Sequence, residues 1–256
     1  MIVSTELFSL EGKVGIVTGA SRGIGRAIAL GLARAGADIA LAARSTGDLE
    51  TLKAEVESLG RRAVAVPTDV NERDQIAALI ERTVDDLGGV DILVNNAGGI
   101  RFTAPLLALR PEGWSKVMRV NADATFHATQ LAAQRMVDSG GGSIIQMASV
   151  AGLRGAETLS VYSAAKGAIR LMSQAVAKEL AGSGVRVNSI APGWIATDLN
   201  ANLRADTDSN RAVVSSIPMG RWGLADEVVG AAIFLASDAS SFVTGATIVV
   251  DGGQTA

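Results

Sequence analysis

Residues 18–25 read TGASRGIG, and this stretch decides the fold class of the chain. It lies between an apolar segment, residues 14–18, and a stretch with helical apolar periodicity, residues 24–35. Glycines permit positive φ angles and close approach of the backbone, while a helix N-terminus offers free N–H groups to an anion. Glycines also occur in ordinary turns, but between a first strand and its helix this loop indicates a site for nucleotide phosphates.

Strand-like and helix-like segments alternate along the rest of the chain. The expected strands are residues 14–18, 38–42, 63–66, 92–95, 143–147, 185–190 and 247–250. The expected helices are residues 24–35, 48–59, 72–87, 111–137, 161–180 and 226–236, and Gly36, Gly60, Gly88 and Gly182 are expected to end four of them in the left-handed conformation. This alternation predicts one doubly wound parallel sheet of about seven strands with helices on both faces, in a single domain spanning residues 1–256.

One connection departs from this pattern. Residues 194–219 are polar, weakly periodic and rich in Asn and Asp. Long irregular segments inside compact domains are usually lids or binding loops. We therefore expect a flexible substrate lid at residues 194–219.

Composition excludes several kinds of function. The 256 residues carry a net charge of −3 without a basic run, so nucleic acid is not an expected partner. The chain has no cysteine, which excludes thiolate catalysis and cysteine-ligated zinc, and its lone histidine, His127, gives no reason to expect a metal. No apolar run is long enough to cross a bilayer and no secretory pattern is evident, so a cytoplasmic location is expected.

The end of the second strand indicates which dinucleotide is preferred. NAD-binding chains place a carboxylate there, on the ribose 2′-hydroxyl, but this chain has Arg44 and Ser45. Arg44, together with Arg22 of the glycine loop, could pair with a 2′-phosphate. The alternative is that both arginines are ordinary solvated residues. We expect NADP(H), with NAD less favoured.

A second pattern carries proton chemistry. Tyr162 and Lys166 are four residues apart at the start of a helix and share one of its faces. A nearby ammonium is expected to lower the phenol pKa and so make tyrosine a usable acid/base. Ser149 follows the fifth strand, where its hydroxyl could hold a substrate oxygen, although a serine that caps a turn would look the same.

In combination these motifs resemble the short-chain dehydrogenase/reductase family over residues 10–253. Besides the glycine loop and the residues above, the resemblance rests on Asp69-Val70 after the third strand, Asn95-Asn96-Ala97-Gly98 at the end of the fourth, and Asn121 between the fourth and fifth. It also rests on Pro192-Gly193 after the sixth strand and Asp251-Gly252-Gly253 after the last. The resemblance implies an oxidoreductase that moves a hydride between a nicotinamide and a carbonyl or secondary alcohol. It also implies a homotetramer, built through the helices at residues 111–137 and 161–180 and the C-terminal strand.

The resemblance assigns roles residue by residue. Tyr162 would be the general acid/base, Ser149 the carbonyl anchor, Lys166 a ribose ligand beside Tyr162, and Asn121 the holder of a relay water. The cofactor would be bound by Gly19, Ser21, Arg22, Gly23, Ile24, Gly25, Arg44, Ser45, Asp69, Val70, Asn96, Ala97, Gly98, Tyr162, Lys166, Pro192, Gly193, Ile195 and Thr197. Asn95 would be more structural than Asn96.

The sequence leaves the substrate open. A 3-oxoacyl thioester reductase is one reading; it would dock an acidic acyl-carrier protein, yet residues 134–142 offer only Arg135 countered by Asp138. A dehydrogenase of sugar acids or polyols is another, to which polar cleft candidates such as Arg154 and Asn200 would fit. A sensor or scaffold that binds the nicotinamide without turnover is the third, although such proteins typically lack the catalytic residues kept here.

Other loop residues are candidates for the cleft. Arg101, Arg154 and Glu157 should border it, and Arg154 could bind a substrate carboxylate or phosphate unless it is simply solvated. Trp194 follows Pro192-Gly193 and either lines the nicotinamide side or packs in the core.

Overall fold

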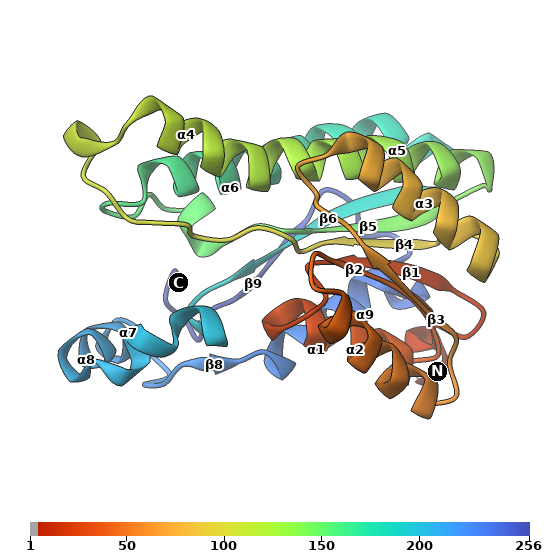
Figure 1. Ribbon diagram of the computed structural model, residues 1–256, viewed down its shortest axis with the longest axis horizontal. Helices are drawn as coiled ribbons and strands as arrows, with labels where there is room; N and C mark the ends of the chain where they lie inside the picture. The colour runs from red at the N-terminus through yellow and green to blue at the C-terminus, as the bar shows by residue number, and fades with distance from the viewer. Residues whose placement is uncertain (1–4) are drawn as a thin grey trace.

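A parallel sheet of seven strands forms the middle layer of the computed structural model, which describes residues 5–256 (Figure 1). Its order is β3-β2-β1-β4-β5-β6-β9. The strands are β1 (Val14–Thr18), β2 (Asp38–Ala43), β3 (Ala63–Pro67), β4 (Ile92–Asn95), β5 (Gly142–Met147), β6 (Val185–Pro192) and β9 (Thr247–Val250). The predicted fold class is confirmed, and the strand bounds differ from prediction by two residues at most.

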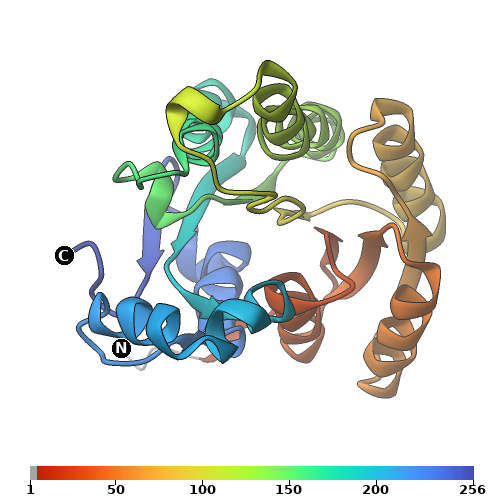
Figure 2. The ribbon, with the colours of Figure 1, turned by 60° about the vertical axis from the view of Figure 1, so that its left-hand side comes forward.

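Helices cover both faces of the sheet (Figures 1 and 2). One layer holds α1 (Gly23–Arg34), α2 (Thr46–Ser58) and α9 (Asp226–Ala236), and the other holds α3 (Arg73–Leu87), α4 (Pro111–Met118), α5 (Ala124–Asp138) and α6 (Ser160–Leu180). Successive strand residues point to opposite faces, so Val17 packs in the core under α1 and α9 whereas its neighbour Ile16 packs in the core under α3 and α5. Burial on both faces explains why the strands are nearly continuous apolar runs.

The strand order determines where a ligand can bind. The chain runs outward from β1 to β3 and then returns to β4, which pairs with the other side of β1. The loops after β1 and β4 therefore diverge to opposite sides and leave a crevice at the carboxyl ends of the strands.

Two predicted helices differ from the structure. The helix expected at residues 111–137 is interrupted by a π-helical turn, Arg119–Asp123, which joins α4 to α5. The expected left-handed glycine Gly182 is wrong, because the chain continues from α6 through a 3₁₀ turn, Ala181–Ser183, and Gly184 has the positive φ of 76°. A three-residue 3₁₀ turn and Gly184 therefore separate α6 from β6.

Residues 194–219 contain more regular secondary structure than their weak periodicity suggests. They contain the short helices α7 (Ala201–Ala205) and α8 (Thr207–Ser215). They also contain β7 (Ile195–Ala196), which pairs with β8 (Gly223–Leu224) in a separate two-stranded parallel sheet. Helices this short do not show the apolar recurrence that identifies longer ones.

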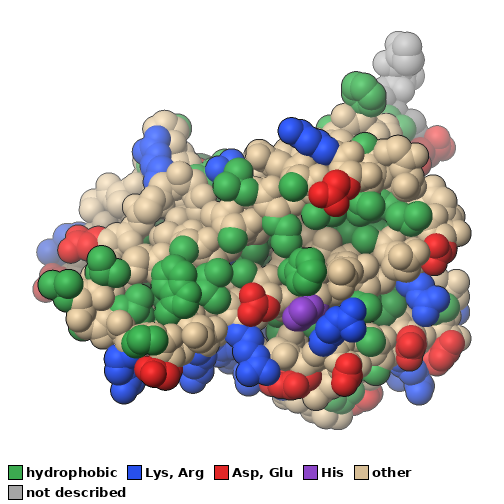
Figure 3. All heavy atoms as spheres, turned by 90° about the horizontal axis from the view of Figure 1, so that it is seen from above, with side chains coloured by type: hydrophobic (Ala, Val, Ile, Leu, Met, Phe, Trp, Pro, Cys, Tyr) green, Lys and Arg blue, Asp and Glu red, His purple; other side chains and the backbone are tan. Residues whose placement is uncertain are grey.

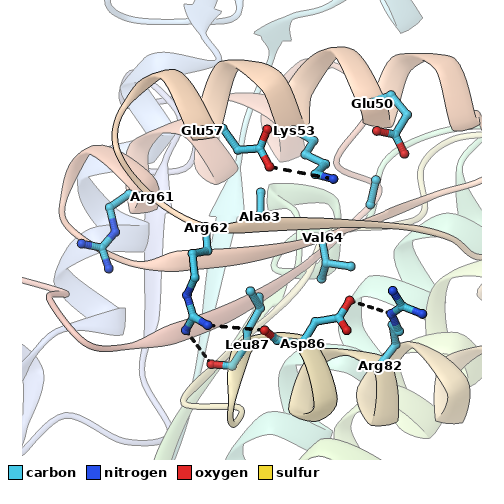
Figure 4. A pocket seen from close by; sticks show the side chains of 11 residues that line it. Glu50, Lys53, Glu57, Arg61, Arg62, Ala63, Val64, Arg82, Asp86 and Leu87 are labelled. Atoms are coloured by element: carbon cyan, nitrogen blue, oxygen red, sulfur yellow. Dashed lines mark hydrogen bonds and ion pairs between the residues drawn. The ribbon is translucent and has the colours of Figure 1, made fainter.

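A hollow of about 500 Å³ lies at the open edge of β3, between α2 and α3 (Figure 4). Several of its charged side chains have partners: Lys53 Nζ lies 3.8 Å from Glu57, Arg82 Nε lies 2.6 Å from Asp86, and Arg62 donates to the carbonyl of Leu87 at 2.8 Å. Charged side chains along an open strand edge oppose pairing with another chain. Among residues 5–256, no helix is long and apolar enough to cross a membrane.

Candidate active site

A cleft of about 1000 Å³ lies at the carboxyl ends of the strands. Every cofactor residue expected from the sequence lines it: Gly19, Ser21, Arg22, Gly23, Ile24, Gly25, Arg44, Ser45, Asp69, Val70, Asn96, Ala97, Gly98, Tyr162, Lys166, Pro192, Gly193, Ile195 and Thr197. Ser149 and Asn121 are buried directly behind its wall. The fold thus brings the predicted residues from six loops to one cavity.

The glycine loop is shaped to admit an anion at the N-terminus of α1. Gly19 and Gly23 have φ angles of 65° and 56°, and a Cβ at Gly25 would collide with the carbonyl oxygen of Gly19 and with Nδ2 of Asn96. In the described chain no side chain caps the first turn of α1, because Arg22 at the N-cap makes no capping hydrogen bond. Its N–H groups face the cleft, as the phosphates of a dinucleotide require.

Asn96 holds this loop in place. Its Nδ2 donates to the carbonyl oxygens of Thr18 at 3.0 Å and Gly19 at 3.2 Å. The Thr18 hydroxyl accepts from the backbone N–H groups of Asn96 and Ala97, both at 3.0 Å. Asn95 instead donates into a buried network, to Gln146 at 2.9 Å and to Thr129 at 3.1 Å.

The cleft has two exposed cations near the ends of β1 and β2. Arg22 and Arg44 both line it, from the glycine loop and from the end of β2. Asp69 lies beside them, and its Oδ1 accepts from the backbone N–H of Asn71 at 3.0 Å and from Asn71 Nδ2 at 2.7 Å. Asp48 and Asn71 also line the cleft and were not expected; Asn71 stands two residues after Asp69, a spacing typical of a side chain that closes a turn.

Tyr162 lines the cleft, and the buried Ser149 lies next to it. The Ser149 hydroxyl forms a hydrogen bond with the Tyr162 phenol and also accepts from Ala151 N–H at 3.1 Å. It therefore caps the 3₁₀ turn Val150–Gly152, which is one of the two roles considered from the sequence, and the hold on a substrate oxygen stays a prediction.

Lys166 is almost fully buried beneath Tyr162. Its Nζ lies 5.8 Å from the centre of the Tyr162 ring and donates to the carbonyl of Met147 at 2.7 Å. Burial lowers the pKa of Lys166 from 10.5 to about 8.

The pKa of Tyr162 departs from the sequence-based expectation. Burial raises the pKa of this phenol, and the hydrogen bond with Ser149 opposes that rise. Burial rather than the ammonium of Lys166 thus decides the direction, so the expectation that Lys166 lowers this pKa is wrong for the structure as it stands. The ammonium lies over the face of the ring and is engaged by Met147.

The π-helical turn places Asn121 against the loop that follows β4. Asn121 is fully buried; its Oδ1 accepts from Gly99 N–H at 3.0 Å, and its Nδ2 donates to the carbonyl of Val117 at 3.0 Å. A Cβ at Gly98 would lie 2.5 Å from Asn121 Oδ1 and 3.7 Å from Lys166 Nζ. Gly98, with φ of 146°, is therefore needed for the close contact between the loop after β4 and this turn.

Asn200 and Arg204 organise the loop after β6, a feature that sequence reasoning missed. Asn200 donates to the carbonyl of Ile195 at 2.7 Å and accepts from Thr197 N–H at 3.0 Å, while Arg204 donates to the Thr197 carbonyl at 3.1 Å. Trp194 lines the cleft and also packs edge-on against Trp222, with ring centres 5.4 Å apart.

Of the three loop residues expected to border the cleft, Arg101, Arg154 and Glu157, only Arg101 lines it. Arg154 does not line the cleft; its Nη2 donates to the carbonyl of Thr255 at 2.7 Å, which ties its loop to the C-terminal turn. Glu157 is exposed and is also absent from the cleft wall. Arg101 does line the cleft, in the loop that follows Gly98 and Gly99. It has no ion-pair partner among residues 5–256.

Comparisons with known proteins agree with this geometry. A family model described as enoyl-(acyl carrier protein) reductase matches residues 19–255. A 2-dehydro-3-deoxy-D-gluconate 5-dehydrogenase of Pseudoalteromonas atlantica is 46% identical over 252 residues, which cover 97% of this chain and 98% of that protein. A 3-oxoacyl-(acyl-carrier-protein) reductase of Thermotoga maritima is 40% identical, with 95% and 98% covered. The crystal structure of a gluconate 5-dehydrogenase from Burkholderia cenocepacia in complex with NADP and tartrate has a TM-score of 0.93 and 41% identity, with 98% of each chain covered.

The chain belongs to the short-chain dehydrogenase/reductase family. It is an oxidoreductase of that family, which acts on CH–OH groups. The sensor or scaffold alternative is not supported, since the relatives above are named as enzymes.

Proposed function

We propose that this protein is an NADP(H)-dependent dehydrogenase of sugar acids, which interconverts a secondary hydroxyl and a ketone on a polyhydroxy carboxylate. The observation that carries the proposal is Arg101, a cleft cation without an ion-pair partner among residues 5–256. A guanidinium in this position is suited to a substrate carboxylate. Two of the relatives support the same substrate class, because they are named for gluconate or a deoxygluconate.

The catalytic roles follow from the geometry around Tyr162. In alcohol oxidation, the substrate hydroxyl lies beside the Ser149 hydroxyl and the Tyr162 phenolate, and the phenolate takes the hydroxyl proton. The glycine loop, Asn96 and the loop at residues 192–197 would hold the dinucleotide, which would supply the hydride acceptor. Lys166 Nζ lies over the face of the Tyr162 ring. Asn121 accepts from Gly99 N–H and so holds the loop after β4. In reduction, Tyr162 returns the proton to the oxygen.

NADP(H) is the proposed cofactor. Arg22 and Arg44 both line the cleft and are exposed, so each is free to form a charged hydrogen bond with a 2′-phosphate. Among the cleft residues, the carboxylate closest to Arg44 in sequence is Asp48. It lies in the first turn of α2 and not at the end of β2, where an NAD-binding chain carries its carboxylate. Structural relatives crystallised with NADP support this proposal.

The 3-oxoacyl thioester reductase expected first from the sequence is the second candidate. It keeps support from the Thermotoga maritima relative, which is named as a 3-oxoacyl-(acyl-carrier-protein) reductase. An acidic carrier protein needs a basic patch, and residues 134–142 contain one basic residue, Arg135, and one acidic residue, Asp138. Gln134 donates to Asp138 at 2.9 Å. These residues therefore give a carrier-protein site little support. We rank it below the sugar-acid reading.

We also propose that the chain forms a homo-oligomer, a tetramer by the family resemblance. Trp114, Phe126 and Leu171, from α4, α5 and α6, are each more than 40% exposed. Figure 3 shows hydrophobic side chains gathered over this helical face. At the other edge, Phe242 and Val249 are exposed beside β9. A flexible lid over residues 194–219 and a cytoplasmic location stay predictions.

The experiment that tests the substrate class compares NADPH oxidation with keto-sugar acids, an acetoacetyl thioester and a neutral ketone. Arg101→Leu should raise the KM for the keto-sugar acid roughly tenfold or more, because it removes a charged hydrogen bond, and should leave the neutral ketone unchanged. Arg135→Leu, an exposed arginine on α5, is the matched control. Faster turnover of the thioester than of every sugar acid would reject the proposal in favour of the second candidate.

A further inference from the structure

The loop between Ser149 and Tyr162 contains an unusual backbone conformation. Thr158 has φ of 61°, and among residues 5–256 no other non-glycine residue has a positive φ. The left-handed region is unfavourable for L-residues and especially for β-branched ones, so such a conformation persists only where surrounding contacts require it. Outliers of this kind concentrate at functional sites.

A tight turn explains the conformation of Thr158. Leu159 N–H donates to the carbonyl of Ala156 at 3.1 Å, which closes a four-residue turn with Glu157 and Thr158 at its centre. A positive φ at the third residue alone is the signature of a type II turn, a position that glycine or asparagine normally occupies. Here threonine occupies it, at the end of the loop that leads into α6.

The turn directs one carbonyl at the opposite loop. The carbonyl oxygen of Thr158 accepts a hydrogen bond from Ala104 N–H at 3.0 Å. The residues next to this bond, Thr103 on one side and Leu159 on the other, both line the cleft. The bond therefore joins the loop that carries Arg101 to the loop that leads into α6 and Tyr162.

We propose that the Thr158 turn is a specificity-determining device: its backbone bond to Ala104 holds the loop of Arg101 at a set distance from Tyr162 and so selects substrates by the spacing between carboxylate and carbinol carbon. The role of Arg101 in this inference rests on the proposed function; the bond between the loops does not. Thr158 is a positioning residue, since its side chain is exposed and its carbonyl acts through Ala104.

A matched pair of proline variants tests the inference. Proline is compatible with the second position of a type II turn but cannot adopt a positive φ, so Glu157→Pro keeps the turn and Thr158→Pro breaks it. Ala104→Pro removes the donor from the opposite loop without touching α6. Thr158→Gly keeps the conformation and relieves its strain, and should raise Tm by about 2–4 °C.

Two readouts separate this inference from the proposed function. Hydrogen exchange at Ala104 N–H should be slow in wild type, Glu157→Pro and Thr158→Gly and fast in Thr158→Pro, whatever the substrate is. The ratio of kcat/KM for a keto-sugar acid to that for a neutral ketone should fall about fivefold to tenfold in Thr158→Pro and in Ala104→Pro, the effect expected for one hydrogen bond. The other two variants should keep the ratio.

Several results would overturn the inference. A fall in kcat/KM that is equal for both substrates in Ala104→Pro would mean that the bond only supports folding. Slow exchange at Ala104 in Thr158→Pro would mean that the turn does not hold the loops together. If Thr158→Pro does not fold, Ala104→Pro with an unchanged selectivity ratio refutes the inference alone. A wild-type enzyme that turns over only neutral ketones or thioesters would reject the sugar-acid proposal, and exchange at Ala104 would still test the bond.

Discussion

Replacing the buried lysine Lys166 by methionine should abolish turnover and yet not weaken the fold at neutral pH. Lys166 is only 4% exposed, and burial lowers its pKa from 10.5 to about 8. Keeping the ammonium charged inside the fold at pH 7 therefore costs about 3 kcal/mol. Methionine has a similar length and no charge, so the variant is free of this cost.

The gain is partly offset by one hydrogen bond. Lys166 Nζ donates to the Met147 carbonyl at 2.7 Å, and the variant leaves that oxygen without this donor at a cost of about 1–3 kcal/mol. The net stabilisation expected at pH 7 is about 1 kcal/mol. The difference in unfolding free energy between wild type and Lys166→Met should also depend on pH. This dependence is the more specific signal, because residue 166 titrates only in the wild type.

The direction of the pH effect follows from proton binding. Unfolded Lys166 keeps its proton up to pH about 10.5, whereas folded Lys166 releases it near pH 8, so between these values the unfolded state binds more protons. Wild-type stability should therefore rise by about 2–3 kcal/mol relative to Lys166→Met as pH increases from 7 to 10. Urea unfolding at a fixed protein concentration measures this difference. Lys178→Met, an exposed lysine of the same helix, is the control and should show almost no such trend. A pH-independent difference between wild type and Lys166→Met would refute the burial argument.

Two further predictions concern the cofactor site. Arg44→Ala and Arg22→Ala should each raise the KM for NADPH by roughly tenfold or more, the worth of a charged hydrogen bond, and leave the KM for NADH unchanged; equal effects on both cofactors, measured by absorbance, would place the arginines elsewhere. Gly98→Ala would put a Cβ 2.5 Å from Asn121 Oδ1 at a backbone φ of 146°, so it should lower Tm by several degrees and kcat at least tenfold. Gly89→Ala, with open space around its Cβ, is the control and should change neither. Wild-type kcat in Gly98→Ala would show that the Asn121 contact does not support catalysis.

Much of the fold could be predicted because local and long-range requirements agree. The strand, glycine loop and helix at residues 14–34 carry apolar segments of the right period and glycines where the backbone needs them. The π-helical turn at Asn121 could not be predicted, because one extra residue in a helical turn scarcely changes the apolar recurrence. The short helices α7 and α8 were missed for want of length.

The site was predicted in its composition but not in its details. Arg154 and Arg101 look alike in sequence, and only the fold shows that Arg154 bonds to the Thr255 carbonyl while Arg101 faces the cleft. The spacing of Tyr162 and Lys166 puts them on one face but does not reveal that burial outweighs the ammonium in setting the phenol pKa. The conformation of Thr158 was hidden as well, because threonine is not a residue that indicates a positive φ.

The most direct test of the central claim, that Tyr162 is the acid/base, is the rate of NADPH oxidation by Tyr162→Phe at saturating keto-sugar acid. Phenylalanine keeps the ring and removes only the hydroxyl. The variant should bind NADPH within about twofold of wild type and lose roughly 100-fold or more in kcat, as expected when a general acid is removed. A variant that keeps the wild-type kcat would contradict the assignment of Tyr162 and the mechanism built on it.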